Sequence, residues 1–240
     1  MTVGLIQVKS ISSSQFENEL IKLKTKEENI MRLKSLVVAM VAVASLAPVA
    51  SEAQSSSENP WMVRVRAVDL LWQNGQSGSV VQPGNVKAAN KVIPELDVSY
   101  FFTKNIAAEL VLTYPQTIQI NYTAAQTQLG TIKALPPSLL LQYHFTDLGA
   151  FKPYIGAGVN YTIFSSRNNL GNGAYSVDQS SLGVVGQIGA DYFLDKNWGL
   201  NVDLKYATMS TNVTATSGGA NVGKLTLNPW MPGVGVTYKF

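Results

Sequence analysis

The stretch that most constrains this chain runs from Leu135 to Phe164, where apolar residues alternate with polar or small ones. Leu139, for example, falls on the opposite face from Gln142 if the stretch is extended, because successive side chains of a β-strand point to opposite faces. The pattern predicts two antiparallel strands, 135–145 and 152–164, joined by a tight turn. Each is longer than the usual five or six residues, a length that suits a tilted strand crossing a bilayer.

Six further segments alternate in the same way. Short turns follow the second, fourth and sixth of the eight predicted strands, and longer polar loops follow the others. An even number of strands lets the last pair with the first, so that no edge is left unpaired. The sequence therefore predicts an all-β fold, an eight-stranded antiparallel, up-and-down transmembrane β-barrel over residues 61–240. The six other strands are expected at 61–71, 93–102, 106–114, 182–194, 198–211 and 224–240, and the long loops at 73–91, 115–131, 165–181 and 212–223.

The distribution of charge over the two faces of the strands indicates which face points outward from the barrel. With the apolar face outward, the positions assigned to lipid carry no charge. An Arg or Lys facing the middle of a bilayer would cost about 2–4 kcal/mol. The charges inside the strands fall on the other face and predict a polar plug that fills the narrow lumen. These residues are Arg64, Arg66, Glu95, Asp97, Glu109, Asp191, Asp203, Lys205 and Lys239.

A soluble barrel of the lipocalin type is the alternative, because it would show the same alternation with its apolar face inside. Three features favour a membrane. The strands are long, tyrosine and tryptophan cluster at strand ends as in interfacial aromatic belts, and the chain closes on an aromatic strand ending at Phe240.

A secretory signal peptide is expected at residues 31–53. Met31 to Lys34 form a basic start, the apolar segment 36–46 is too short to span a bilayer as a helix, and Ser51-Glu52-Ala53 fits a cleavage site. Residues 1–30 are then interpreted as a mis-assigned upstream extension, the alternative being a cytoplasmic extension or signal anchor. Residues 54–60 are expected to be a short polar segment before the barrel.

Several motifs occurring in one order resemble the outer membrane protein W (OmpW) family. They are LPPSLLLQYHF, KPYIGAGVNYTIF, GVVGQIGADYFLDKNW, NPW and the closing GVTYKF. The resemblance implies an eight-stranded barrel in the bacterial outer membrane, with a narrow apolar pathway for uptake of small hydrophobic molecules. It also implies an apolar constriction near Val111 and Leu182, although Leu182 is outward by parity in the predicted register.

Toward the long loops the inward residues become apolar, which predicts an apolar funnel above the plug. A molecule in that funnel would need a side exit. Proline has no N–H and weakens strand pairing, so Pro115, Pro136 and Pro137 predict a lateral opening between the third and fourth strands, unless they only terminate strands at a loop. The predicted pathway is lined by Leu70, Val111, Leu140, Phe164, Leu182, Met209 and Met231.

Other classes of function have less support. The chain has no cysteine and one histidine, so neither a Cys-ligated nor a multi-histidine metal site is expected, and no cofactor is indicated. A net charge of +3 is too small to predict nucleic-acid binding. A structural or adhesive barrel remains an alternative. A lipid-modifying enzyme is a weaker one, because His144 is the single candidate base of its kind and is expected to make a lumen hydrogen bond. Expected partners are outer-membrane lipids, small hydrophobic ligands and, through the C-terminal aromatic strand, the barrel-insertion machinery; the oligomeric state is left open.

Overall fold

The computed structural model describes residues 59–77, 86–122 and 127–240. The predicted upstream extension 1–30, the signal peptide 31–53 and residues 54–58 of the polar segment lie outside the described residues. Within the described part, no helix is long and apolar enough to cross a membrane.

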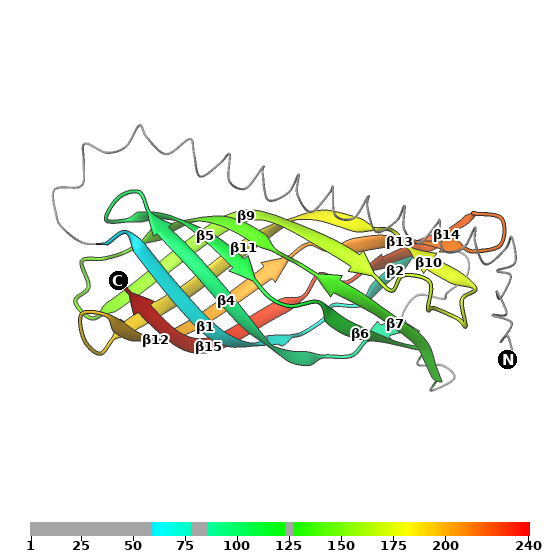
Figure 1. The fold of residues 1–240 in the computed structure, drawn as a ribbon, viewed down its shortest axis with the longest axis horizontal. Helices are drawn as coiled ribbons and strands as arrows, with labels where there is room; N and C mark the ends of the chain where they lie inside the picture. The colour runs from blue at the N-terminus through cyan, green and yellow to red at the C-terminus, as the bar shows by residue number, and fades with distance from the viewer. Residues whose placement is uncertain (1–58, 78–85, 123–126) are drawn as a thin grey trace, which may run out of the picture. The chain divides into compact units, whose positions relative to one another are not determined.

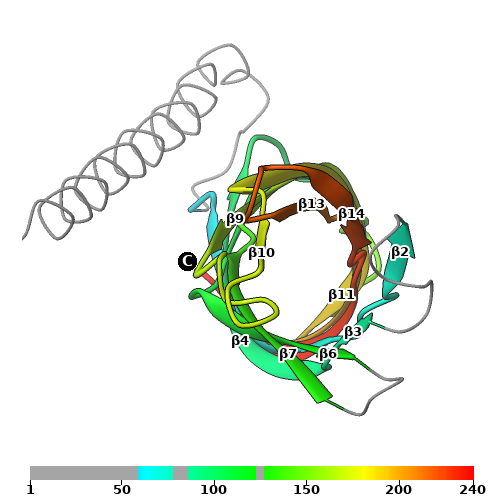
Figure 2. The ribbon, with the colours of Figure 1, turned by 90° about the vertical axis from the view of Figure 1, so that its right-hand side faces the viewer.

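Eight antiparallel strands close into a barrel (Figures 1 and 2). Each pairs with its neighbours around the ring, and pairing between β9 and β11 closes it. The last strand, β15, pairs with the first, β1. The predicted eight-stranded up-and-down barrel is therefore confirmed. Its strands, in order around the ring, are β1 (Trp61–Leu70), β4 (Lys91–Phe101), β5 (Ile106–Leu112), β8 (Ser138–His144), β9 (Phe151–Ser165), β11 (Ser180–Phe193), β12 (Trp198–Ala207) and β15 (Trp230–Lys239).

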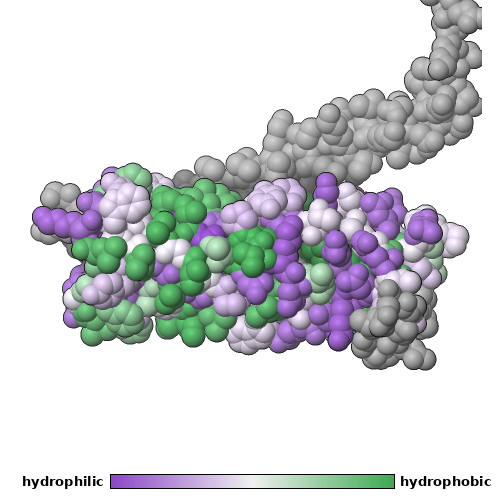
Figure 3. Space-filling model, turned by 90° about the horizontal axis from the view of Figure 1, so that it is seen from below, coloured by the Kyte–Doolittle hydropathy of each residue, from purple (hydrophilic) through white to green (hydrophobic). Residues whose placement is uncertain are grey.

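Burial alternates along each of these strands as the sequence predicts. On β11, Ile188 is 58% exposed whereas the adjacent Gln187 is 4% exposed. The outward apolar side chains form a band over the half of the barrel with the short turns, and the other half is mostly hydrophilic (Figure 3). Asp69 is one outward charge that the prediction did not count. It lies opposite Val92 near the loop end of β1.

The long predicted loops are not structureless, which corrects the sequence interpretation. Two sets of short strands continue the wall beyond the apolar band: β3 and β7 flank β6 in the main sheet, and β10, β13, β14 and β2 form a second sheet. The predicted strands 198–211 and 224–240 are each broken in two, the second at Asn228, which has a positive φ of 32°, and Pro229. The additional strands are β2 (Gly75–Ser77), β3 (Val86–Ala88), β6 (Gln116–Tyr122), β7 (Thr127–Leu135), β10 (Tyr175–Val177), β13 (Ser210–Ala215) and β14 (Asn221–Thr226).

Candidate functional site

Charged side chains meet inside the barrel in the half that bears the short turns. Arg64 on β1 extends across the lumen to Asp191 on β11, with Nη2 2.7 Å from Oδ2 and Nε 3.1 Å from Oδ1. Its Nη1 lies 2.6 Å from Oε2 of Glu109 on β5, and its Cζ lies 4.6 Å from the ring centre of Tyr154. Such two-pronged guanidinium–carboxylate contacts are among the stronger hydrogen bonds in proteins. Arg64 therefore connects widely separated strands of the wall.

Arg66 and Lys205 extend this network toward the middle of the barrel. Arg66 Nε lies 3.1 Å from Glu95 Oε1, its Nη1 lies 3.2 Å from Asp203 Oδ2, and its Nη2 pairs with Asp97. Lys205 Nζ lies 2.7 Å from Glu95 Oε1 and 2.6 Å from Asp203 Oδ1. Every one of these side chains is at most 7% exposed. Buried charges are tolerated only when they are paired in this way.

Neutral polar residues that the sequence analysis did not single out complete the plug. Gln187 donates to Glu109 at 3.0 Å and to Asp203 at 2.8 Å. Asn201 and Thr237 donate to Asp191 at 2.8 and 2.5 Å. With Tyr154 on β9 and Gln142 on β8, which donates to Gln187, every strand of the ring contributes a side chain. The alternation along each strand places these residues on the inward face, which could have identified them. Because they are uncharged, nothing distinguishes them in the sequence from the small and polar residues beside them.

Two glycines provide room for the largest members of the plug. A Cβ added at Gly189 would lie 2.4 Å from the hydroxyl oxygen of Tyr154. A Cβ added at Gly235 would lie 2.1 Å from the Val65 carbonyl oxygen and 2.7 Å from Cγ of Arg66. All three distances are shorter than non-bonded atoms tolerate, so a larger residue would displace the strand or the plug. The glycines on these strands are needed for close approach.

His144 and Lys239 lie at the turn end of the lumen. His144 is 2% exposed, its Nε2 lies 3.0 Å from Oε1 of Gln142, and its ring stacks on Tyr154 at 5.0 Å. Lys239, the ninth predicted plug residue, is half-buried, with its amine 5.9 Å from the ring centre of Phe101. Within the described part of the chain, no group of three or more His, Asp or Glu residues is arranged to hold a metal ion.

An apolar core fills the lumen between the plug and the loop end. The structure buries Leu70, Val111, Leu140, Phe164 and Met209 there, and Met231 packs partly buried against them. Apolar side chains of the unpredicted strands and their connections join this core: Trp72, Val86, Ile118, Ile120, Ile132, Leu170, Val177, Leu225 and Leu227.

The placement of Leu182 in the pathway is wrong. Its side chain is 74% exposed on the outer wall, because Ser181 and Gly183 occupy the inward positions on either side. β11 pairs with β9 without a register shift through Leu182↔Tyr161, so no bulge turns the side chain inward. The regular alternation of side chains along β11 therefore turns Leu182 outward, and the inward position that the family resemblance implies is not the one that the structure shows.

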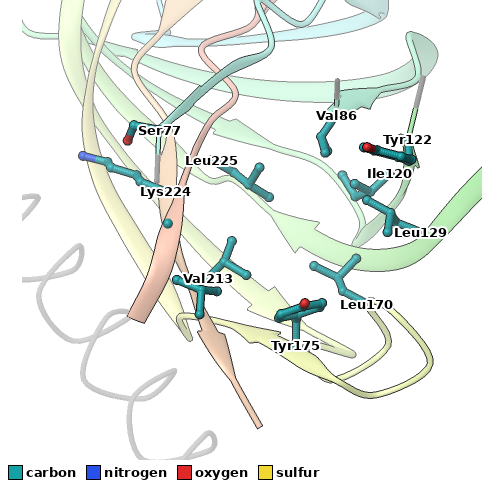
Figure 4. A pocket seen from close by; sticks show the side chains of 12 residues that line it. Ser77, Val86, Ile120, Tyr122, Leu129, Leu170, Tyr175, Val213, Lys224 and Leu225 are labelled. Atoms are coloured by element: carbon teal, nitrogen blue, oxygen red, sulfur yellow. The ribbon is translucent and has the colours of Figure 1, made fainter. Parts of the chain in front are cut away.

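Two cavities lie on this apolar core. The upper one, of about 200 Å³, is at the loop end (Figure 4). The lower one, of about 30 Å³, lies against Glu95 and Lys205 at the top of the plug. Aliphatic and tyrosine side chains point into the upper cavity: Val86, Ile120, Tyr122, Leu129, Leu170, Tyr175, Val213 and Leu225.

The wall beside the lower cavity has an interruption in its strand pairing. β5 pairs with β8 as far as Val111↔Ser138, and pairing resumes above at Gln116↔Ala134 between β6 and β7. The interval holds all three prolines of the predicted lateral opening. Within this interval Asn160 Nδ2 lies 3.3 Å from the carbonyl oxygens of Pro136 and Pro137. On the other side of β5, the Thr113 hydroxyl donates to the Pro94 carbonyl oxygen of β4 at 3.0 Å.

A closed antiparallel barrel with an apolar outer band and buried ion pairs inside defines an outer-membrane β-barrel protein. The model of the OmpW family matches residues 62–240, and the chain belongs to that family. It is accordingly a protein of the bacterial outer membrane.

Known proteins similar to this chain agree with that assignment. It is 41% identical to the uncharacterized outer-membrane protein y4mB of Sinorhizobium fredii, over 80% of this chain and 84% of that one. It is 31% identical to outer membrane protein W of Escherichia coli, over 87% and 100%. It is also 26% identical to the dibenzothiophene metabolism operon protein PahQ of Pseudomonas aeruginosa, over 77% and 90%. The crystal structure of OprG from P. aeruginosa superposes with a TM-score of 0.63 at 27% identity, over 75% of this chain and 95% of that one.

Proposed function

We propose that this OmpW-family barrel carries small hydrophobic molecules across the bacterial outer membrane. The observation that carries the proposal is the order of environments inside the barrel, from an apolar cavity of about 200 Å³ at the loop end to the ion-paired plug at the turn end. A small apolar molecule is stabilised in the first environment by burial of its surface. Passage through the second would separate buried ion pairs, which is strongly unfavourable.

The ligand is therefore proposed to leave sideways, between β5 and β8, into the membrane. The break in pairing at Pro115, Pro136 and Pro137 supports this route. A gap in a wall facing lipid requires that free backbone groups find other partners, and Asn160 Nδ2 provides a side-chain partner for the Pro136 carbonyl oxygen at that place. The name of PahQ, which refers to dibenzothiophene metabolism, is consistent with an aromatic apolar ligand.

The partners follow from the same surfaces. Outer-membrane lipids would contact the apolar band, and small hydrophobic ligands the cavities. The exposed C-terminal Phe240, stacked edge-on against Tyr238 at 4.8 Å, is proposed to engage the barrel-insertion machinery.

A structural or adhesive barrel without transport is the second candidate, favoured by the extent of the plug, which would serve equally well as a stabilising core. An enzymatic role has less support. His144 is held by Gln142 and stacked on Tyr154, an arrangement that orients it as part of the plug.

Uptake of a labelled apolar tracer by cells that produce or lack the protein tests the proposal. Val111→Trp, which fills the lower cavity that Val111 lines, should slow uptake by several-fold. Leu182→Trp is the matched control, because it adds the same ring on the outer wall and should leave uptake at the wild-type rate. Equal uptake with and without the protein would favour the structural barrel.

A separate variant tests the lateral exit. Replacing Pro136 and Pro137 with Thr returns two N–H donors to the wall, which should allow pairing to close the gap. If apolar molecules leave there, uptake should fall while the folded fraction is unchanged. Uptake at the wild-type rate in a correctly folded variant would contradict this exit.

A further inference from the structure

Gln116 presents a buried hydrogen-bond acceptor that the protein does not use. The residue lines the lower cavity and is 2% exposed. Its Nε2 donates to the Tyr114 carbonyl oxygen at 3.0 Å and lies 3.4 Å from the Thr113 hydroxyl. Its Oε1 has no hydrogen-bond partner among the described residues. Because the Tyr114 carbonyl can only accept, the amide is fixed with nitrogen toward the wall and oxygen as the remaining end.

The other polar side chains around this cavity are already paired. Asn160 donates to Ser138 at 2.9 Å and accepts from Thr162 at 2.8 Å. Lys205 at the floor is bonded to Glu95 and Asp203. Buried polar atoms in folded proteins nearly always have a partner, and an exception calls for an explanation. The amide oxygen of Gln116 therefore identifies the one place on this cavity wall that needs an external donor.

The size and surroundings of the cavity limit what that donor can be. About 30 Å³ accommodates a single hydroxyl-sized group but no ring. Apolar side chains, among them Ile118, Met209 and Met231, make up much of the remaining lining. Methionine is unbranched and flexible and adapts to irregular apolar shapes. The cavity therefore suits only the polar end of a molecule, whose apolar body would displace the adaptable methionine side chains and extend toward the upper cavity of about 200 Å³.

We infer that the ligand is an amphiphile with one small hydrogen-bond donor, such as a phenol or an alkanol, whose hydroxyl donates to Oε1 of Gln116. The inference rests on the proposed function and narrows its substrate class from small hydrophobic molecules in general to hydroxylated ones. The polar side of the cavity is also the side where strand pairing is interrupted between Val111↔Ser138 and Gln116↔Ala134. The hydroxyl would thus stay hydrogen-bonded next to the proposed exit.

Equilibrium dialysis of two probes tests the inference on the full barrel in lipid nanodiscs, with empty nanodiscs subtracted. 2-Naphthol has the donor, and 2-methylnaphthalene replaces the hydroxyl with a methyl group of similar size. The measured quantity is the ratio of their affinities, which cancels changes common to both probes. Gln116→Met removes the acceptor, and Gln119→Met is the control, because Gln119 lies on the same strand but faces outward and is exposed.

In the wild type and in Gln119→Met, 2-naphthol should bind about three- to tenfold more tightly than 2-methylnaphthalene, the range expected of one net hydrogen bond. In Gln116→Met the ratio should fall to about one. A ratio near one in the wild type, or an unchanged ratio in Gln116→Met, would overturn the inference while leaving hydrophobic uptake standing, and would indicate that a water serves Oε1. Binding of neither probe to the wild type would overturn both proposals.

Discussion

Arg64 holds both carboxylate oxygens of Asp191 across the lumen, with Nη2–Oδ2 and Nε–Oδ1 distances of 2.7 and 3.1 Å. The two residues are 127 positions apart in the chain and lie on β1 and β11, which are not neighbours in the ring. This contact therefore joins opposite parts of the wall through the interior. It makes the plug a structural element as well as a barrier.

Removing Arg64 should destabilise the barrel strongly. In Arg64→Leu, Asp191 and Glu109 lose their guanidinium partner while remaining buried, and breaking a buried ion pair in this way costs about 3–5 kcal/mol. The free energy of unfolding by urea in detergent micelles measures the loss. The double variant Arg64→Leu/Asp191→Leu should recover part of it, because fewer unpaired charges remain.

The exposed pair Lys104–Asp147 provides the control for that experiment. Its atoms lie 2.5 Å apart, as close as those of the plug, but the side chains are 64% and 79% exposed. Pairs in water contribute little, so Lys104→Leu should leave the unfolding midpoint at the wild-type value. Equal losses in Arg64→Leu and Lys104→Leu would show that burial of the plug is not what stabilises the barrel.

Gly189→Val should displace Tyr154 and weaken the plug, because the new Cβ would overlap the tyrosine ring. Overpacking of a filled interior costs about 1–3 kcal/mol. Gly186→Val on the same strand is the matched control, since nothing lies within 4 Å of a Cβ at this outward position. Urea unfolding should separate the two variants, and a loss confined to Gly186→Val would contradict the assigned faces of β11.

A positive charge should be tolerated above the apolar band and not within it. Val202 is 57% exposed midway along β12, between the aromatic residues Trp198 and Tyr206. Val202→Arg should cost about 2–4 kcal/mol in lipid vesicles. Thr117→Arg, on the outer face of β6 beside the exposed Lys133, should be near neutral. Equal effects of the two substitutions would place the membrane elsewhere on the barrel.

The sequence was sufficient to predict the barrel ring because one rule, apolar outward and charged inward, holds along all eight strands within the apolar band. Beyond that band the rule reverses. On β6, Ile118 and Ile120 face inward, and Thr117 and Gln119 face outward to water. The segment has the period of two, but with its apolar residues inside, so it does not fit a lipid-facing strand and the sequence predicts a loop there. An alternation of inverted sense was the signal that could have identified β6, β7, β13 and β14.

The site was predictable in its charges and less so in its shape. Parity alone places Arg64, Arg66 and their acidic partners inside. Parity also turns Tyr154 inward, but it cannot show that the ring packs between Arg64 and His144, because that contact joins side chains from three strands. The unpaired oxygen of Gln116 depends on where the Tyr114 carbonyl points, which no local pattern encodes.

The most direct test of the account compares two tracers in the same cells, labelled naphthalene and labelled glucose, with and without the protein. An apolar cavity above a sealed plug predicts faster uptake of naphthalene and an unchanged rate for glucose. Equal acceleration of both tracers would mean that the plug admits a water-filled path and would contradict the account.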